Sequence, residues 1–307
     1  MSILLTGASG FIGTNLYKKR EEEFLCVVRK QREHHFTNYF EIDSVHSTTN
    51  WQGAFDGVDC VIHLAGLAHS PDYSDEEYFE VNNLGCLHLA HEAVKAGVKR
   101  FVFVSSIGVN GTITHGKPFD EGGKLLPHNA YAESKCRAEQ ALDVLSKASG
   151  LEVVIIRPTL VYGADAPGNF ASLKKIISKT PFLPFGLVNN RRCFISVDNL
   201  CDFINTCATH PKAVNETFLI SDGTPVSLKE FTNAMAKGMG TTLIQLPVPV
   251  WCMRLVAKLL GKTNLANQLL SDLDVDCSKA KKLLNWDVPE NMLHAMNKLN
   301  RKERKGL

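Results

Sequence analysis

Short apolar runs of strand length recur through the first half of the chain, and longer amphipathic stretches lie between several of them. The runs cover residues 3–5, 24–28, 60–64, 101–104 and 153–156. This alternation of strands and helices predicts an α/β fold with a doubly wound parallel sheet. Because ligands of such sheets bind beyond the carboxyl ends of the strands, the residues that close each run are the first candidates for a functional site.

The first apolar run leads directly into a turn with three glycines, spaced G-x-x-G-x-x-G. Gly7 can adopt a backbone angle closed to other residues, Gly10 lets the chain approach a pyrophosphate, and Gly13 lets the next helix lie close to the strand. A turn between a strand and a helix is the context that a dinucleotide-binding motif requires. The alternative is an ordinary glycine-rich turn.

The pattern loosens after residue 159, where proline and glycine recur at 167–168, 181, 184 and 186. We therefore expect a Rossmann-type dinucleotide-binding domain at 1–165, with its sheet rejoined by about residues 190–222 through strands at 193–197 and 217–221. A smaller, mostly C-terminal α/β substrate domain would comprise 166–189 and 223–307. Within it, Ser227 and Glu230 predict a capping box at the start of a helix.

Composition narrows the classes of partner. The net charge of +2 over 307 residues favours neither a nucleic acid nor a membrane partner, and no apolar run is long enough to span a bilayer. The nine cysteines form no C-x-x-C pair and have no histidines at metal spacing, so we expect no metal site and reduced thiols. A cytoplasmic location follows as an expectation.

Tyr131 and Lys135 lie four residues apart early in a long amphipathic segment, so they share one helix face. A nearby ammonium lowers the pKa of a phenol by favouring the phenolate, which would make Tyr131 an acid or base at neutral pH. Such pairs also occur by chance on many helices. Two serines, Ser105 and Ser106, close a strand about 25 residues earlier.

Taken together, these motifs resemble the short-chain dehydrogenase/reductase superfamily, and most of all its extended members that modify nucleotide sugars. The matching segments are Thr6-Gly7-Ala8-Ser9-Gly10-Phe11-Ile12-Gly13, Leu64-Ala65-Gly66, Val81-Asn82, Ser105-Ser106, Val109-Asn110-Gly111, Tyr131-Ala132-Glu133-Ser134-Lys135, Arg157-Pro158, Val161-Tyr162-Gly163 and residues 192–199. The resemblance spans most of the chain.

The resemblance implies a role for each matching residue. Tyr131 would be the catalytic acid/base, Lys135 would hold the nicotinamide ribose, and Ser106 would hydrogen-bond the reacting oxygen. The implied cofactor-binding residues are Gly7, Gly10, Phe11, Ile12, Gly13, Arg29, Asp43, Leu64, Ala65, Gly66, Asn82, Ser105, Tyr131, Lys135 and Pro158. The implied substrate-binding residues are Ser106, Asn169, Pro184, Phe185 and Arg192.

Three positions depart from the family pattern; the first two narrow the reaction, and the third leaves the identity of the nucleotide open. Ile107 and Gly108 stand where sugar dehydratases carry an acidic pair, so dehydration is not expected. No acid follows the second strand, and Arg29 there could bind a 2′-phosphate, which favours NADP(H) and leaves NAD(H) possible. Residues 266–269 lack the second arginine with which relatives grip the nucleotide, and Leu273 stands near a position that gates the C2 substituent.

The expected function is reduction at C4 of a UDP-4-keto-(6-deoxy)-N-acetylhexosamine, in the synthesis of surface polysaccharide precursors. The alternative is a UDP-hexose or UDP-N-acetylhexosamine 4-epimerase. Further alternatives are a reductase of small carbonyl compounds and a non-catalytic dinucleotide-binding protein. The partners would be a nucleotide sugar and a second copy of the chain, because relatives commonly form homodimers through the helix that carries the tyrosine.

Overall fold

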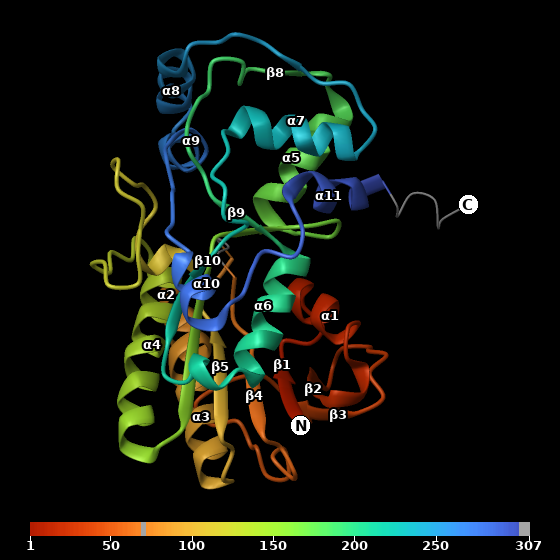
Figure 1. The fold of residues 1–307 in the computed structure, drawn as a ribbon, viewed down its shortest axis with the longest axis vertical. Helices are drawn as coiled ribbons and strands as arrows, with labels where there is room; N and C mark the ends of the chain where they lie inside the picture. The colour runs from red at the N-terminus through yellow and green to blue at the C-terminus, as the bar shows by residue number, and fades with distance from the viewer. Residues whose placement is uncertain (69–71, 301–307) are drawn as a thin grey trace.

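The computed structural model describes residues 1–68 and 72–300. Its centre is a seven-stranded parallel sheet in the order β10-β6-β5-β4-β1-β2-β3 (Figure 1). The strands are β1 (Ile3–Thr6), β2 (Phe24–Arg29), β3 (Tyr39–Ile42), β4 (Cys60–His63), β5 (Arg100–Val104), β6 (Glu152–Pro158) and β10 (Thr217–Ile220). The chain starts in the middle at β1 and winds outward in both directions, which confirms the predicted doubly wound sheet.

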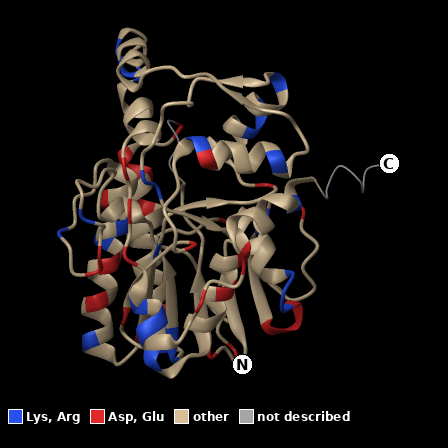
Figure 2. Cartoon of the chain, turned by 45° about the horizontal axis from the view of Figure 1, so that its top comes forward, with Lys and Arg blue, Asp and Glu red and all other residues tan. Residues whose placement is uncertain are grey.

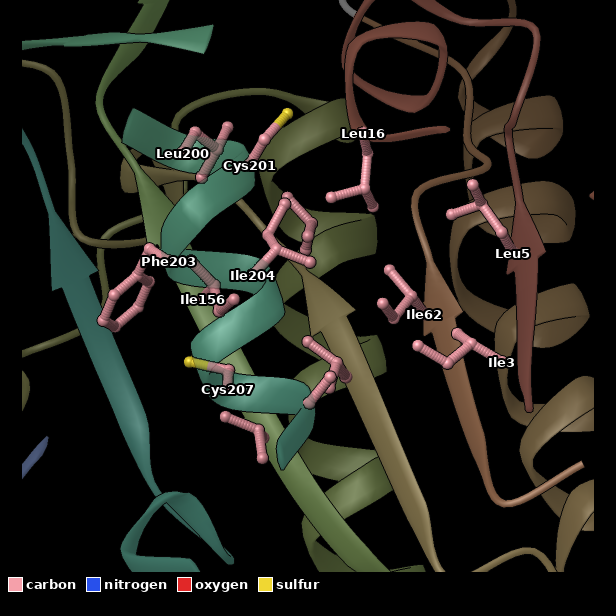
Figure 3. Close-up of a cluster of buried hydrophobic side chains, with 14 of the residues drawn as sticks. Ile3, Leu5, Leu16, Ile62, Ile156, Leu200, Cys201, Phe203, Ile204 and Cys207 are labelled. Carbon is pink, nitrogen blue, oxygen red and sulfur yellow. The ribbon is translucent and has the colours of Figure 1, made fainter. Parts of the chain in front are cut away.

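Both faces of the sheet are covered, because strand side chains point alternately to opposite faces. Ile3 and Leu5 pack with α1 (Phe11–Tyr17), α6 (Val197–Thr209) and α10 (Ser278–Leu284), whereas Leu4 packs with α3 (Cys86–Lys95) and α4 (Ala130–Ser149). Figure 3 shows the first of these faces, with Leu16 of α1 and Ile204 of α6 turned toward the strands. These continuous apolar strands are typical of a parallel sheet buried on both faces.

A third apolar cluster lies apart from the sheet, in the upper half of Figure 1. Its residues come from β7 (Leu160–Tyr162), α5 (Gly168–Lys179), β8 (Phe182–Leu183), β9 (Phe194–Ser196), α7 (Leu228–Gly238), α8 (Val250–Leu259), α9 (Thr263–Leu270), α11 (Met292–Asn297) and η5 (Lys298–Asn300). Ser227 and Glu230 form the expected capping box at α7. The domain boundaries themselves stay a prediction.

Two predicted strands have different partners. Residues 217–220 join the main sheet beside β6, as expected, but β9 pairs with β7 in a separate two-stranded sheet. The expectation that residues 193–197 also rejoin the main sheet is therefore wrong. The edge next to β6 is already occupied by β10, which leaves β9 to pair with the short strand that continues from β6.

The remaining elements are short. They are η1 (Glu21–Glu23), α2 (Asp75–Phe79), the π-helical turn η2 (Glu80–Gly85), η3 (Ile107–Val109), η4 (Pro211–Ala213) and β11 (Ile244–Gln245). All nine cysteines are unpaired thiols, and seven are buried. Across the described ranges, no helix combines the length and the apolar character needed to cross a membrane.

Candidate active site

A pocket of about 390 Å³ opens beyond the carboxyl ends of β5 and β6. Ser106, Tyr131, Pro158, Asn169 and Arg192 all line it, although they are spread over 87 positions of the sequence. The structure therefore brings together five residues that were predicted separately. Their roles stay predictions, but the geometry gives one place where they can act on one ligand.

Tyr131 lies in the first turn of α4, which the Asn129 side chain caps by accepting a hydrogen bond from the amide of Ala132 at 2.9 Å. Its ring meets the Tyr78 ring edge to face, with centroids 6.1 Å apart. A hydrogen bond joins Tyr131 to Ser106, whose Oγ also accepts from the amide of Gly108 at 3.1 Å. Tyrosine and serine are thus already paired at the pocket wall.

The pKa of Tyr131 shifts in the direction opposite to the expected one. Burial raises it, and the hydrogen bond from Ser106 opposes this rise without cancelling it. Lys135 is not among the groups that shift this pKa, so the expected lowering by its ammonium is absent. Its Nζ donates to the carbonyl of Val104 at 3.1 Å and lies 4.6 Å from the centroid of the Phe103 ring. In this structure Tyr131 therefore holds its proton at neutral pH.

Lys135 is buried, and its burial lowers the pKa of the ammonium to about 8. Gly66 is its close neighbour, since a Cβ there would lie 3.3 Å from the lysine Nζ and 2.8 Å from Oδ1 of Asn82. Asn82 in turn accepts from the Leu67 amide and donates to the Leu67 carbonyl. Three predicted cofactor-binding residues from distant segments therefore meet at one point, and only glycine fits between them.

A groove of about 750 Å³ runs along the glycine turn and shares Ala68 with the pocket. Gly7, Gly10, Arg29 and residues 64–66 line it. Gly7 has φ +73°, and a Cβ on Gly13 would lie 2.2 Å from the carbonyl oxygen of Gly7. The turn therefore requires glycine at both positions, as the predicted dinucleotide cradle does, and the residues present fit that group.

Other predicted cofactor residues lie outside the lining of this groove. Phe11 and Ile12 are in the first turn of α1 and pack against the sheet core. Asp43 is exposed and pairs with Lys30 at 3.2 Å, so the structure does not bring its side chain into the groove. The Ser105 hydroxyl is buried and has no hydrogen-bond partner within the described residues.

Sequence reasoning missed Arg32, which lines the groove together with Arg29. Both arginines are exposed, so their guanidinium groups remain available for an anion. The signal was visible in the sequence, because Arg29 ends a strand that carries no acid at its end and Arg32 follows three residues later. Two cations at this end of the groove strengthen the case for a phosphate there.

Two arginines from different elements converge on Ser271. Arg192 donates to its carbonyl at 2.8 Å, and Arg254 of α8 donates to its hydroxyl at 3.2 Å and to Oδ1 of Asn267 at 3.1 Å. Burial lowers the pKa of Arg192 to about 10, so it stays charged at neutral pH. Arg254 thus supplies a second guanidinium near residues 266–269, where the sequence lacks one. No sequence motif marks Arg254, because its contact with Ser271 depends on how α8 packs on α9.

Pro184 and Phe185 do not line the pocket with Arg192 and Asn169. They lie in a separate apolar groove of about 410 Å³ between the loop after β8 and helices α8 and α9, which we call the α8–α9 groove. Leu269 lines both the groove and the pocket. Leu273, predicted as a gate, lines the pocket and is also buried.

A buried ion pair joins β6 to the helix that carries Tyr131. Arg157 of β6 donates to both carboxylate oxygens of Glu139 on α4, at 3.0 and 3.1 Å, and to Oδ1 of Asn110 at 3.1 Å. The side chains of Arg157 and Glu139 are only 6% and 4% exposed. The contact ties the tyrosine helix to the strand and to the turn after Ser106, so these segments keep one relative position.

Comparison with known proteins identifies the family of the chain. The family described as "NAD dependent epimerase/dehydratase family" matches residues 3–221. The chain is 42% identical over 301 residues to a UDP-glucose 4-epimerase of Vibrio cholerae, covering 95% of this chain and 92% of that protein. It is 29% identical over 272 residues to an N-acetyl-alpha-D-glucosaminyl-diphospho-ditrans,octacis-undecaprenol 4-epimerase of Escherichia coli O157:H7, covering 85% and 81%.

Among solved structures, a UDP-N-acetylglucosamine 4-epimerase from Bacillus cereus superposes with a TM-score of 0.80 over 99% of both chains, at 20% identity. At that identity the match supports the fold alone. This fold is the Rossmann-type sheet together with the smaller elements that form the third apolar cluster. The family match covers the whole sheet and every predicted catalytic residue. The chain is an NAD(P)-dependent enzyme and belongs to the NAD dependent epimerase/dehydratase family of extended short-chain dehydrogenases/reductases.

Proposed function

We propose that this enzyme is a 4-epimerase of a UDP-linked hexose or N-acetylhexosamine. The observation that carries the proposal is the 42% identity to a UDP-glucose 4-epimerase over nearly the full length of both chains. The sequence alone favoured net reduction of a 4-keto sugar, but the comparisons support the epimerase alternative better. Ile107 and Gly108 line the pocket beside Ser106 and carry no acid, which favours either reaction over dehydration.

The residues of the site suit this chemistry. NAD(P) bound in the groove would supply the acceptor and donor of hydride for C4 of the sugar. Tyr131, protonated in this structure, would exchange a proton with the C4 oxygen, and Ser106 would hydrogen-bond the same oxygen as its charge changes. Lys135 remains mostly charged below pH 8, so it would place a cation next to the ribose and the phenol.

The diphosphate of the sugar nucleotide would bind between Arg192 and Arg254. Both guanidinium groups already approach one residue, Ser271, and guanidinium is well suited to phosphate oxygens. Asn169 at the start of α5 lines the same pocket and would contact the substrate. Leu273 at the pocket wall would leave room for an N-acetyl group.

A net 4-ketoreductase is the second candidate, and Arg29 with Arg32 is the observation that favours it. These two cations line the groove where an acid would accept the ribose hydroxyls of NAD, so we propose a preference for NADP(H). A reductant consumed in every turnover suits a ketoreductase. An epimerase recovers its cofactor within each cycle and can use either nucleotide.

The two functions are separated by one pair of incubations. UDP-N-acetylglucosamine and UDP-glucose are incubated with the enzyme without added reductant, and the products are followed by NMR. In parallel, a UDP-4-keto-6-deoxy-N-acetylhexosamine is incubated with NADPH, and the loss of NADPH absorbance is recorded. We expect C4 epimers in the first incubation. NADPH consumption in the second without any epimer in the first would overturn the epimerase proposal.

A further inference from the structure

Helix α8 lies at one end of the molecule (Figure 1). It exposes a row of large apolar side chains. None of its residues is buried, and the exposed fractions reach 67% for Trp251, 50% for Leu255 and 78% for Leu259. These three are four residues apart, so they lie along one stripe of the helix. Leu260, just after the helix, is 66% exposed. We call these four residues the α8 face.

The segment that carries this face is basic. No Asp or Glu occurs between Phe231 and Ser271. The same segment contains Lys237, Arg254, Lys258 and Lys262. Figure 2 shows blue and no red on α8. An apolar stripe with tryptophan and leucine, flanked by lysines, is the composition of helices that lie in the interface of a bilayer.

We propose that the α8 face docks on an anionic lipid bilayer. The helix would lie in the plane of the head groups, with Trp251, Leu255 and Leu259 inserted and with Lys258 and Lys262 near lipid phosphates. The overall charge of +2 predicted no such partner because it averages this basic segment with acidic ones elsewhere. Surface docking requires no spanning helix.

The charge argues against a second copy of the chain as the occupant. In a two-fold symmetric contact the same patch meets itself, so Lys258 and Lys262 would face identical lysines with no acid in the segment to pair them. The phosphates of an anionic bilayer would instead attract both lysines. Docking would also bring the substrate pocket close to the bilayer, because Arg254 on this helix reaches Ser271 and Leu269 lines both the α8–α9 groove and the pocket.

Tryptophan fluorescence gives a direct readout. The chain has three tryptophans, of which Trp51 and Trp286 are 2% and 9% exposed, so Trp251 is the only one that vesicles can reach. The full-length protein is mixed with phosphatidylcholine vesicles that contain or lack phosphatidylglycerol. We expect co-sedimentation and a blue shift of the emission only with phosphatidylglycerol, and a decrease of both with added salt.

Matched variants test the face itself. The double variant Leu255→Glu/Leu259→Glu should bind vesicles at least about tenfold more weakly, because two apolar side chains no longer leave water and two acids oppose the lipids. Leu293→Glu changes a leucine of α11 that is 51% exposed and should bind within about twofold of the parent chain. Circular dichroism and sugar turnover check that both variants are folded.

Three outcomes would overturn the proposal. The first is a parent chain that fails to bind phosphatidylglycerol vesicles. The second is equal binding by the double variant. The third is a parent dimer that the double variant converts to monomer in light scattering, without vesicle binding, which would assign the α8 face to a second copy of the chain.

Discussion

Replacing Lys135 with methionine should make the folded protein more stable at neutral pH while removing its activity. Burial lowers the pKa of this lysine from 10.5 to about 8, so at pH 7 the folded chain holds a buried ammonium at a cost of about 3 kcal/mol. Methionine is of similar length and needs no solvation. Loss of the hydrogen bond to Val104 and of the contact with Phe103 offsets part of the gain, which leaves a net stabilisation of about 1–2 kcal/mol.

The pH dependence of this stability difference tests whether the buried ammonium of Lys135 causes it. The lysine pKa is lower in the folded chain, so the unfolded chain binds more protons between pH 8 and 10.5, and the lysine contribution to stability rises with pH in that interval. The difference in free energy of unfolding between Lys135→Met and the parent should therefore narrow by about 1 kcal/mol from pH 7 to pH 9. Burial raises the pKa values of cysteines such as Cys26 and Cys60, so their contribution to stability falls as the pH rises. This contribution is the same in both proteins and cancels when their free energies of unfolding are subtracted.

The assay is urea unfolding of nucleotide-free protein at both pH values, followed by circular dichroism, with sugar turnover measured on the same samples. A variant that is less stable than the parent by the same amount at pH 7 and pH 9 would refute the reasoning. It would show that the lysine is held by favourable contacts rather than tolerated at a cost.

Four further predictions test the site and the assembly. Tyr131→Phe should lower turnover at least about a hundredfold and leave NADPH binding unchanged in a fluorescence titration; near-normal turnover would remove Tyr131 as proton donor. Arg29→Asp should shift the preference from NADP toward NAD in direct titrations, and tighter NAD binding by the parent would contradict its role. Arg254→Ala should weaken UDP binding about tenfold in calorimetry, whereas Arg191→Ala, which loses a surface ion pair, should not. Val144→Glu, at an exposed position of α4, should convert the expected homodimer to monomer in light scattering; a parent chain that is already monomeric would rule the dimer out.

Local patterns made much of the fold predictable. The glycine turn, the capping box at Ser227 and the Tyr131–Lys135 spacing each depend on residues within a few positions of one another, and the structure forms all three local geometries. The alternation of strands and helices likewise indicated the winding of the main sheet. These features follow from backbone conformation and burial, which the residue types largely determine.

Features that depend on packing between distant segments were beyond this reasoning. β9 has the same apolar pattern as a core strand, and only the occupied edge of the sheet sends it to β7. Arg254 reaches Ser271 because α8 packs on α9, which no spacing in the sequence shows. Helical spacing placed Lys135 on the face of Tyr131, but it could not show that the ammonium would bond to Val104 instead.

The region around the buried pair of Arg157 and Glu139 and the exposed helix α8 should differ in local stability. Arg157 links α4 to β6 and to Asn110 in the turn after Ser106, so we expect the segments around Ser106 and Tyr131 to belong to the most stable part of the molecule. Helix α8 has no buried residue and contributes only partly buried side chains to the third cluster, so we expect its amides to exchange with deuterium before those of α4. Heating should therefore weaken the grip on the sugar nucleotide first and disable proton transfer last.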